Sequence, residues 1–307
     1  MSKTNDKVIA IFCSDIHLSL TPPVWRSAEP DWLEAQKRPL LELQQLKDKY
    51  NCPIFCAGDV FDKWNSPAEL INFALEYLPD MYAIPGQHDL PLHNLNDIKK
   101  SAFWTLIKAG KIIHNKSETD KIIVGPPIRI EAFSYGIKIE PIKKEESDKR
   151  ILICLAHQYV WIKGYSYPNV PKENVLYNLQ KQLKGYEIAV FGDNHKHFYT
   201  SMENTQVWNC GALIRRKSDE KDYRPCVGLL TAGGHIKIHY LDISQDKHLT
   251  NYDNINSKED IDIDGFIKNL ENLGDTALNF VDAVKRYFED KKTNKEIMNI
   301  IFKAMEN

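Results

Sequence analysis

Five short apolar runs dominate the first two thirds of the sequence, and each ends abruptly in glycine, aspartate or histidine. The runs are four to six residues long, which is typical of buried β-strands and too short for most helices. Strands that end in polar residues in this way indicate a site at one edge of a sheet. We expect these strands at residues 8–13 (VIAIFC), 53–57, 81–85, 151–156 and 188–191.

The segments between the first three runs have the spacing of helices. Leucines at positions 33, 40, 43 and 46 lie on one face of a helix expected over residues 31–50. A second helix is expected over residues 67–78, with Pro67 in its first turn. Strands that alternate with helices predict an α/β fold.

A different pattern follows Gly192. The chain changes there to shorter segments of alternating polarity separated by turn residues, at 207–210, 227–230 and 235–241. These segments predict a second, mostly antiparallel sheet. We therefore expect two packed β-sheets flanked by helices, with the five polar strand ends at one edge.

The last part of the chain predicts a separate unit. Residues 246–264 are polar and weakly patterned, which indicates a linker and a domain boundary near residue 250. Apolar residues at 280–288 lie on one helix face, and Thr293 and Glu296 form a capping-box pattern that opens a last helix. We expect residues 1–250 to form the main domain and residues 251–307 to form a linker and a small helical capping segment.

Composition narrows the class of protein only a little. With 43% apolar residues, 27% charged residues and a net charge of −2, the chain is typical of globular proteins and is not a uniformly basic nucleic-acid coat. It has no apolar run of about 18 residues, and the polar start MSKTNDK lacks a signal-peptide pattern, so we expect no membrane association and a cytoplasmic location. The six cysteines form no CxxC pair, and we expect them to be reduced and structural.

Side chains of the kinds that bind metals cluster at the five strand ends. Each motif alone is weak, because Gly-Asp pairs are common in turns. An imidazole or a carboxylate at every one of five strand ends is hard to explain as packing, since buried charges must be paired or must bind metal. The candidates are Asp15 and His17; Asp59 and Asp62 after Gly58; Gln87, His88 and Asp89 after Gly86; His157; and Asp193, His195 and His197 after Gly192.

The order of these motifs resembles the signature of calcineurin-like metallophosphoesterases: D-x-H, GD-x-x-D, GNH followed by Asp or Glu, a strand-terminal His, and GH-x-H. The resemblance extends over residues 8 to about 200 and implies a four-layer αββα sandwich with two metal ions. Three further runs are similar to the SbcD-type branch of DNA repair nucleases. They are DIHL at 15–18, GDVFD at 58–62 with Pro67 soon after, and NCGAL at 209–213.

The resemblance implies a role for each candidate. One ion would be bound by Asp15, His17, Asp59 and His195. The other would be bound by Asp59, Gln87, His157 and Asp193, so that Asp59 bridges the pair. A hydroxide held between the ions would attack phosphorus in line. His88 would protonate or stabilise the leaving oxygen, Asp89 would orient His88, and Asp62 would hold a ligand by a hydrogen bond.

Two positions depart from the family pattern, and both belong to the second ion. Gln87 stands where the family has Asn, and Asp193 stands where it has the first His of GH-x-H. Because an anionic oxygen favours hard ions, we expect Mn²⁺, with Mg²⁺, Fe and Zn²⁺ as alternatives. A shifted alignment would instead use His195 and His197 as the H-x-H pair. Both departures keep a residue type that can bind a metal ion.

Three functions fit these residues. The first is a two-metal phosphodiesterase acting on DNA, an exonuclease or endonuclease of the SbcD branch, with an SbcC-type coiled-coil ATPase and a homodimer as its implied assemblies. The second is a phosphatase or cyclic-nucleotide phosphodiesterase with a small substrate, because the fold does not select the substrate. The third is a non-catalytic scaffold, motivated by Gln87 and Asp193.

Two further features fit both a binding role and a structural role. The aromatic residues Tyr159, Trp161, Tyr165 and Tyr167 follow His157 and either stack nucleobases or pack a long loop. The basic run at 215–217 either contacts a phosphate backbone or forms an ordinary basic hairpin.

Overall fold

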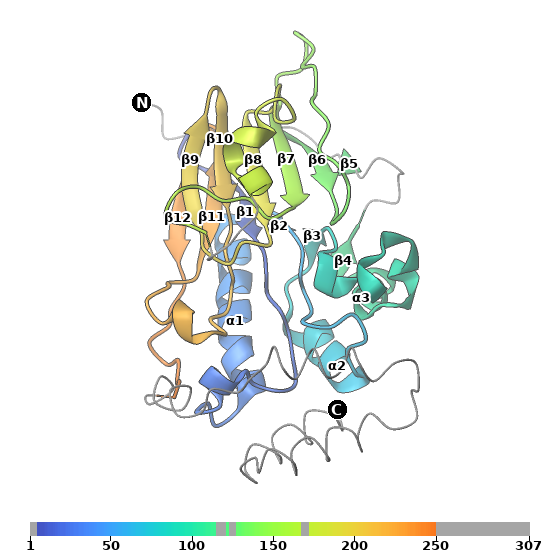
Figure 1. Cartoon of the computed structure of the whole chain (residues 1–307), viewed down its shortest axis with the longest axis vertical. Helices are drawn as coiled ribbons and strands as arrows, with labels where there is room; N and C mark the ends of the chain where they lie inside the picture. The colour runs from blue at the N-terminus through green and yellow to red at the C-terminus, as the bar shows by residue number, and fades with distance from the viewer. Residues whose placement is uncertain (1–4, 115–120, 123–126, 167–171, 250–307) are drawn as a thin grey trace. The chain divides into compact units, whose positions relative to one another are not determined.

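The computed structural model describes residues 5–114, 121–122, 127–166 and 172–249. The strands form two sheets of six strands each (Figure 1). The order in the first sheet is β12 (Ile236–Tyr240), β11 (Cys226–Thr231), β1 (Val8–Cys13), β2 (Ile54–Cys56), β3 (Met81–Ala83) and β4 (Ile112–Ile113). The order in the second sheet is β5 (Lys121–Ile122), β6 (Ile128–Phe133), β7 (Ile151–His157), β8 (Ile188–Gly192), β10 (Thr205–Asn209) and β9 (Phe198–Met202).

All five strands expected from the apolar runs are present, as β1, β2, β3, β7 and β8. In the first sheet β1, β2 and β3 are parallel, and in the second sheet β6, β7 and β8 are parallel. The carboxyl ends of parallel strands meet at the same edge of a sheet. Figure 1 shows these ends converging near the middle of the view. The predicted α/β architecture of two sheets flanked by helices is confirmed.

The segments after Gly192 pair differently from the prediction. Strand β10 is parallel to β8 and antiparallel to β9, so both β9 and β10 complete the second sheet. Strand β11 is antiparallel to β1 and β12 is antiparallel to β11, so these two complete the first sheet. The expected separate antiparallel sheet is therefore wrong, because alternating polarity identifies a strand without determining its neighbour.

Strand β1 is buried on both faces, which explains why its sequence is apolar throughout and does not alternate. Ala10 and Phe12 belong to the core between the two sheets, together with residues of β7 and β8. Ile11 and Cys13 belong to a second core that joins the first sheet to helices. The strand that leads to Asp15 is thus fixed from both sides.

Three α-helices of the described residues pack in this second core: α1 (Trp32–Tyr50), α2 (Ala68–Tyr77) and α3 (Ala102–Lys108). The side chain of Asp31 caps α1 by accepting a hydrogen bond from N of Glu34 at 3.0 Å, and Asn51 ends α1 with a left-handed φ of 47°. The outer face of the second sheet is covered by a short 3-10 helix, Leu176–Leu179, and the residues around it.

Several predictions about the whole chain can be compared with the described residues. All six cysteines are buried and free, as expected for structural thiols. No helix of the described residues is long and apolar enough to span a lipid bilayer. The linker and helices expected after residue 250 lie outside the described residues, and so does Tyr167.

Candidate two-metal centre

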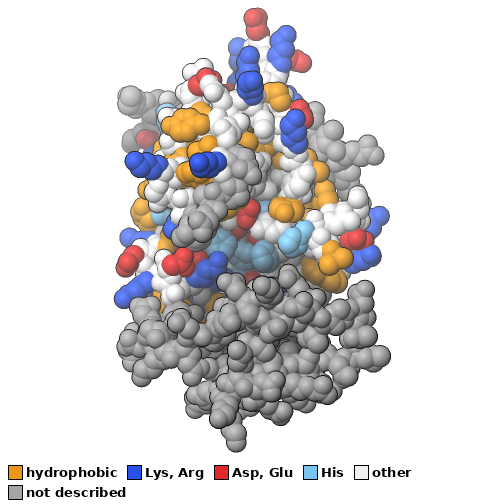
Figure 2. Space-filling view, viewed as in Figure 1, with side chains coloured by type: hydrophobic (Ala, Val, Ile, Leu, Met, Phe, Trp, Pro, Cys, Tyr) orange, Lys and Arg blue, Asp and Glu red, His pale blue; other side chains and the backbone are white. Residues whose placement is uncertain are grey.

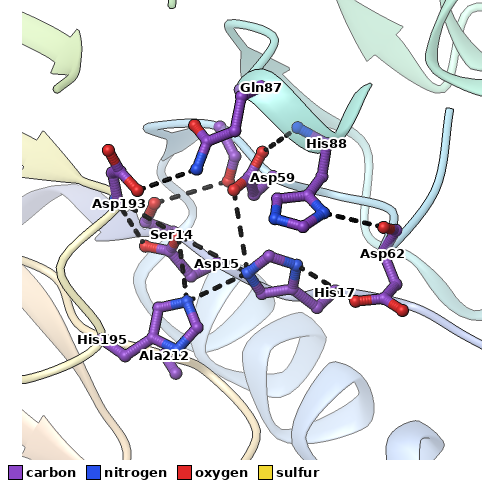
Figure 3. A network of polar contacts seen from close by, with 12 residues as sticks. Ser14, Asp15, His17, Asp59, Asp62, Gln87, His88, Asp193, His195 and Ala212 are labelled. Carbon is purple, nitrogen blue, oxygen red and sulfur yellow. Dashed lines mark hydrogen bonds and ion pairs between the residues drawn. The ribbon is translucent and has the colours of Figure 1, made fainter. Parts of the chain in front are cut away.

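Four of the predicted ligands lie in strained backbone just after strands. Asp15, His17, Asp59 and Asp193 have φ angles of 51°, 51°, 54° and 82°, in the left-handed region that residues other than glycine rarely adopt. Each such residue costs about 1 to 3 kcal/mol, and such residues concentrate at functional sites. The turns bring these four side chains together in one place (Figure 3).

The glycines of the motifs allow the loops to approach one another closely. A Cβ atom on Gly58, where φ is 103°, would lie 2.3 Å from Nδ1 of His157. A Cβ atom on Gly86 would lie 2.0 Å from Oδ1 of Asp59, and one on Gly192 would lie 2.1 Å from Oγ of Ser14. Any larger residue at these positions would displace a candidate ligand or its support.

Asp15, His17 and His195 form the first ligand group. Nε2 of His17 lies 3.1 Å from Nε2 of His195 and 3.8 Å from Oδ1 of Asp15. Two ligand atoms that each lie about 2.1 Å from an ion, at about a right angle, are about 3 Å apart, so this spacing fits a shared cation. Nδ1 of His195 lies 3.4 Å from Oε1 of Glu220. That carboxylate favours a proton on Nδ1 and leaves the Nε2 lone pair for an ion.

The second ligand group is built around His157. Its Nδ1 donates to the carbonyl oxygen of Ala57 at 2.5 Å, which places a proton on Nδ1 because a carbonyl can only accept. Its Nε2 lies 2.6 Å from Oε1 of Gln87 and 3.3 Å from Oδ2 of Asp59. A neutral imidazole would therefore direct a lone pair at two oxygens. A cation among these three atoms would satisfy all of them.

Asp59 lies between the two groups. Its Oδ1 accepts a hydrogen bond from the backbone N of His88 at 2.9 Å. Its Oδ2 is buried without a hydrogen-bond partner among the described residues, and lies 3.7 Å from Nε2 of His17 and 3.3 Å from Nε2 of His157. A buried carboxylate oxygen without a donor is costly. This orphaned oxygen fits the bridging position that the resemblance implies.

Asp193 reaches both groups. Its Oδ1 accepts a hydrogen bond from Nε2 of Gln87 at 2.8 Å. Its backbone N donates to the two carboxylate oxygens of Asp15 at 3.2 and 3.1 Å. The structure therefore brings both departures from the family pattern to the same place as the other candidate ligands.

His197 lies elsewhere. Its imidazole packs among aromatic rings, with centroid distances of 6.2 Å to Trp208, 5.5 Å to Tyr223 and 5.8 Å to Tyr240. Neither His197 nor Asp193 belongs to the groups of His, Cys, Asp and Glu side chains that could hold a metal ion among the described residues. Asp193, unlike His197, contacts the candidate ligand Gln87, and this contact favours Asp193 over the shifted alignment.

Burial and the neighbouring histidines shift the pKa values of Asp15 and Asp59 in opposite directions. Burial raises the pKa of Asp15 to about 6. Burial would also raise the pKa of Asp59, but the neighbouring His157 and His17 hold that pKa below its usual range. A divalent cation would favour the ionised form of both carboxylates, and so would complete the charge balance of the site.

His88 lies beside the first ligand group, and together with His17 and Asp62 it also forms a group of side chains that could hold a metal ion. Its ring is edge-on to the ring of His17, with a centroid distance of 4.9 Å. Its Nδ1 donates to the carbonyl oxygen of Asp62 at 2.8 Å, which fixes the ring orientation and leaves Nε2 to exchange a proton. The side chain of Asp62 lies near His17 as well, with Oδ1 3.7 Å from Nδ1.

The role predicted for Asp89 differs from the one that the structure shows. Its buried carboxylate accepts backbone hydrogen bonds from Val60, Phe61 and Gly86 at 3.2, 2.9 and 3.0 Å. Asp89 therefore ties the loop after β2 to the loop after β3. It does not orient His88, whose ring is held by the carbonyl oxygen of Asp62 instead.

The basic run at 215–217 is used within the fold. Arg215 forms an ion pair with Asp246 at 2.9 Å, and Arg216 forms one with Asp62 at 2.8 Å. Arg216 also donates to the carbonyl oxygen of His17. Arg216 therefore supports the loops that carry His17 and Asp62. The structural interpretation holds for Arg215, which is buried.

Glu220 is a site residue that the sequence analysis missed. It is buried, its Oε1 contacts His195, and its Oε2 accepts a hydrogen bond from N of Lys217 at 3.0 Å. No motif marks this residue, which lies 25 positions after His195 in a polar loop. The one available signal is an acidic residue close to a run of basic residues, and this signal is common on protein surfaces.

The NCGAL run at 209–213 supports two candidate ligands through the backbone. N of Ala212 donates to the carbonyl oxygen of His195 at 3.0 Å, and N of Leu213 donates to the carbonyl oxygen of Asp15 at 3.2 Å. On the surface, Figure 2 shows histidine side chains gathered on one face with acidic side chains beside them.

The family model of the calcineurin-like phosphoesterases matches residues 10–197, which is more than half of the 307 residues. The chain therefore belongs to the calcineurin-like phosphoesterase family, and it is a metal-dependent phosphoesterase. No curated protein sequence matches the chain significantly.

Solved structures resemble the chain distantly. An archaeal phosphodiesterase is 12% identical with a TM-score of 0.39, over 76% of this chain and 99% of that one. A putative 5′-nucleotidase from Staphylococcus aureus is 12% identical with a TM-score of 0.43, over 76% of this chain and 53% of that one, so this chain spans about half of its length. A dimetal phosphatase from Danio rerio is 10% identical with a TM-score of 0.44, over 74% of this chain and 93% of that one. Similarity as low as this does not indicate which substrate the chain acts on.

Proposed function

We propose that the protein is a DNA phosphodiesterase of the SbcD type, an exonuclease or endonuclease that uses two divalent ions, with Mn²⁺ as the first candidate. The observation that carries the proposal is the position of residues 209–213, the run that resembles the SbcD branch. This run hydrogen-bonds to the backbone of both Asp15 and His195. The resemblance to that branch therefore concerns residues in contact with the site.

The donor set fits two divalent ions. One ion would be held by Asp15, His17 and His195, the other by His157, Gln87 and Asp193, with Asp59 between them. Ions bound there would polarise the phosphoryl oxygens and activate a water molecule. Manganese or magnesium is favoured because the carboxylates and the amide supply hard oxygen ligands.

The chain's own residues carry the remaining tasks. The ring of His88 is fixed by its hydrogen bond to the carbonyl oxygen of Asp62, so its Nε2 can pass a proton to the leaving oxygen. Asp89 holds two site loops together through three backbone hydrogen bonds. Glu220 orients His195 through Nδ1.

A second candidate is a phosphatase or cyclic-nucleotide phosphodiesterase acting on a small substrate. Arg215, one of the basic residues considered for contact with a DNA backbone, is buried in an ion pair with Asp246. A site with fewer free cations around it has less attraction for a polyanion. This observation favours a substrate with one or two phosphates.

A substrate panel with Mn²⁺ tests both candidates. Linear DNA, a cyclic dinucleotide and a generic phosphomonoester are each incubated with the wild-type protein and with the Asp59→Asn variant. The proposal expects degradation of DNA that Asp59→Asn abolishes. Hydrolysis of the cyclic dinucleotide or of the phosphomonoester without degradation of DNA would support the second candidate. No hydrolysis of any of the three substrates would contradict both.

The partner implied by the SbcD resemblance and the oligomeric state are proposals as well. We propose a homodimer and an SbcC-type coiled-coil ATPase as partners. Light scattering on the isolated protein measures the first. Co-purification with the coiled-coil ATPase encoded by the same organism tests the partnership. A protein that cuts DNA but does not co-purify with this ATPase would contradict it.

A further inference from the structure

We propose that Tyr135 and His93 form a subsite for a nucleobase beside the second ligand group. The inference rests on the proposed function, because it names the part of a nucleotide substrate that this chain would recognise next to the phosphate. Neither residue belongs to the metal-ligand motifs.

Tyr135 is fixed close to the candidate centre. It follows β6, and its backbone N donates to the carbonyl oxygen of Pro85 at 3.2 Å, one residue before Gly86. Its ring is edge-on to the ring of His157, with a centroid distance of 6.3 Å and an interplanar angle of 62°. Tyr135 is therefore in ring contact with a candidate metal ligand.

His93 continues this series of rings away from the centre. Its imidazole is edge-on to the ring of Tyr135, with a centroid distance of 6.0 Å and an interplanar angle of 83°. His157 is buried, Tyr135 is half-buried and His93 is exposed. The three rings therefore lead from the candidate centre outward to solvent.

The polar atoms of these two outer rings are not used by the fold. Within the described part of the chain, neither the hydroxyl of Tyr135 nor a ring nitrogen of His93 has a hydrogen-bond partner. Tyr135 is half-buried and His93 is exposed, so the hydroxyl and the imidazole remain available to a ligand.

The backbone at Leu92 and His93 is strained, and burial of the leucine side chain does not explain the strain. Leu92 and His93 have consecutive left-handed φ angles of 48° and 58°, and Leu92 is 91% exposed. A leucine held in this way on the surface gains nothing from burial. The strained turn instead holds the His93 ring against Tyr135, and Gly136 next to Tyr135 borders open space.

A nucleobase fits this arrangement best among the parts of a phosphoester substrate. Its flat face can stack on an aromatic ring, and its edge can hydrogen-bond to a hydroxyl or an imidazole. Stacking of one base on an aromatic side chain typically changes affinity by about 5- to 150-fold. Because every base has such a face, the subsite would tolerate different bases.

Calorimetric titration of the Mn²⁺-loaded protein with two phosphonate analogues tests the subsite. In both analogues a methylene group replaces the ester oxygen, so that neither is hydrolysed; one carries adenosine and the other carries ribose alone. We expect the adenosine analogue to bind at least about 5-fold more tightly. Tyr135→Leu should remove that advantage while leaving the affinity for the ribose analogue unchanged. Tyr135→Phe should keep most of it.

Two variants make the test specific. Tyr177→Leu changes an exposed tyrosine that has no ring contact with a site histidine among the described residues, and it should keep the preference for adenosine. His93→Ala changes an exposed residue and should lower the preference even if Tyr135→Leu fails to fold. Equal affinities of the two analogues for the wild-type protein would overturn the inference, and so would equal weakening of both by Tyr135→Leu. A preference for adenosine in a protein that does not cut DNA would contradict the nuclease proposal alone.

Discussion

Nε2 of Gln87 donates a hydrogen bond to Oδ1 of Asp193 at 2.8 Å, although the two residues are 106 positions apart in the chain. These are the two positions at which the chain departs from the pattern of its family. Gln is longer than Asn by one methylene, and Asp is shorter than His. The lengths are therefore complementary, and we infer that the two departures form one unit.

This pairing predicts that the two departures are energetically coupled. Gln87→Asn and Asp193→His should each weaken the binding of the second ion. Each substitution restores the family residue at one position, but the side chain at the other position then no longer matches it in length. The double variant should recover an Mn²⁺ affinity close to that of the wild type and use Zn²⁺ better, since imidazole suits Zn²⁺. Metal titration of all four proteins measures the coupling. Additive losses in the double variant would show that the residues act separately.

Removal of single side chains distinguishes Asp193 from His197 as a ligand. Asp193→Ala should lower the metal content by about one ion, because its carboxylate reaches Gln87. His197→Ala should keep both ions and lose about 1 kcal/mol of stability, since its ring packs between Trp208 and Tyr223. Metal analysis and thermal unfolding measure the two effects. The opposite pattern would support the shifted alignment.

The sequence predicted the strand ends well because the physics there is local. An apolar run buried on both faces, followed by glycine and a charged residue, indicates a strand with a site at its end, as in β2 before Gly58 and Asp59. Pairing between distant segments is not local. The partners of β10 and β11 depend on contacts across the whole domain, which alternating polarity does not encode.

The same distinction explains the errors at the site. Asp89 stands next to His88 in the sequence, but its carboxylate turns toward the backbone of Val60 and Phe61. Glu220 contacts His195 from a loop that carries no motif. Both roles are set by how loops from different strands meet, and neither spacing nor residue type reveals this.

His88 should be needed for turnover and not for metal binding. His88→Ala is expected to keep both ions and to lower kcat by about 10² to 10⁴, because the lost ring can no longer pass a proton to the leaving oxygen. The rate of bis(p-nitrophenyl) phosphate hydrolysis measures the loss of turnover, and metal analysis shows whether both ions are kept. The exposed His235 offers a matched control, and His235→Ala should behave as the wild type. Loss of an ion from His88→Ala would make His88 a ligand.

Glu220 should act on metal affinity through His195. Glu220→Gln is expected to weaken metal binding by about 10- to 100-fold, because the carboxylate that holds Nδ1 of His195 loses its charge. Titration with Mn²⁺ measures the change. Asp219→Asn removes the same charge from the exposed neighbouring residue and should leave the affinity unchanged. Similar effects of both substitutions would indicate a general charge effect.

Asp89 should be needed for the stability of the site loops. Asp89→Asn replaces one of its acceptor oxygens by an amide nitrogen, which would face a backbone N–H of Val60, Phe61 or Gly86. An unsatisfied buried group of this kind costs about 1 to 3 kcal/mol. Urea denaturation measures the loss. An unchanged free energy of unfolding would mean that the three hydrogen bonds contribute little.

The metal content of Asp59→Asn, measured together with its activity, tests the two-metal site most directly. Among the residues that the structure describes, Oδ2 of Asp59 is buried without a hydrogen-bond donor and lies between the histidines of both ligand groups. After loading with Mn²⁺ and dialysis, the wild-type protein should hold two ions per chain and hydrolyse bis(p-nitrophenyl) phosphate. Asp59→Asn should lose both ions together and all measurable turnover, because one carboxylate serves both ions. A variant that keeps two ions, or that loses one ion and remains active, would contradict the bridging role of Asp59.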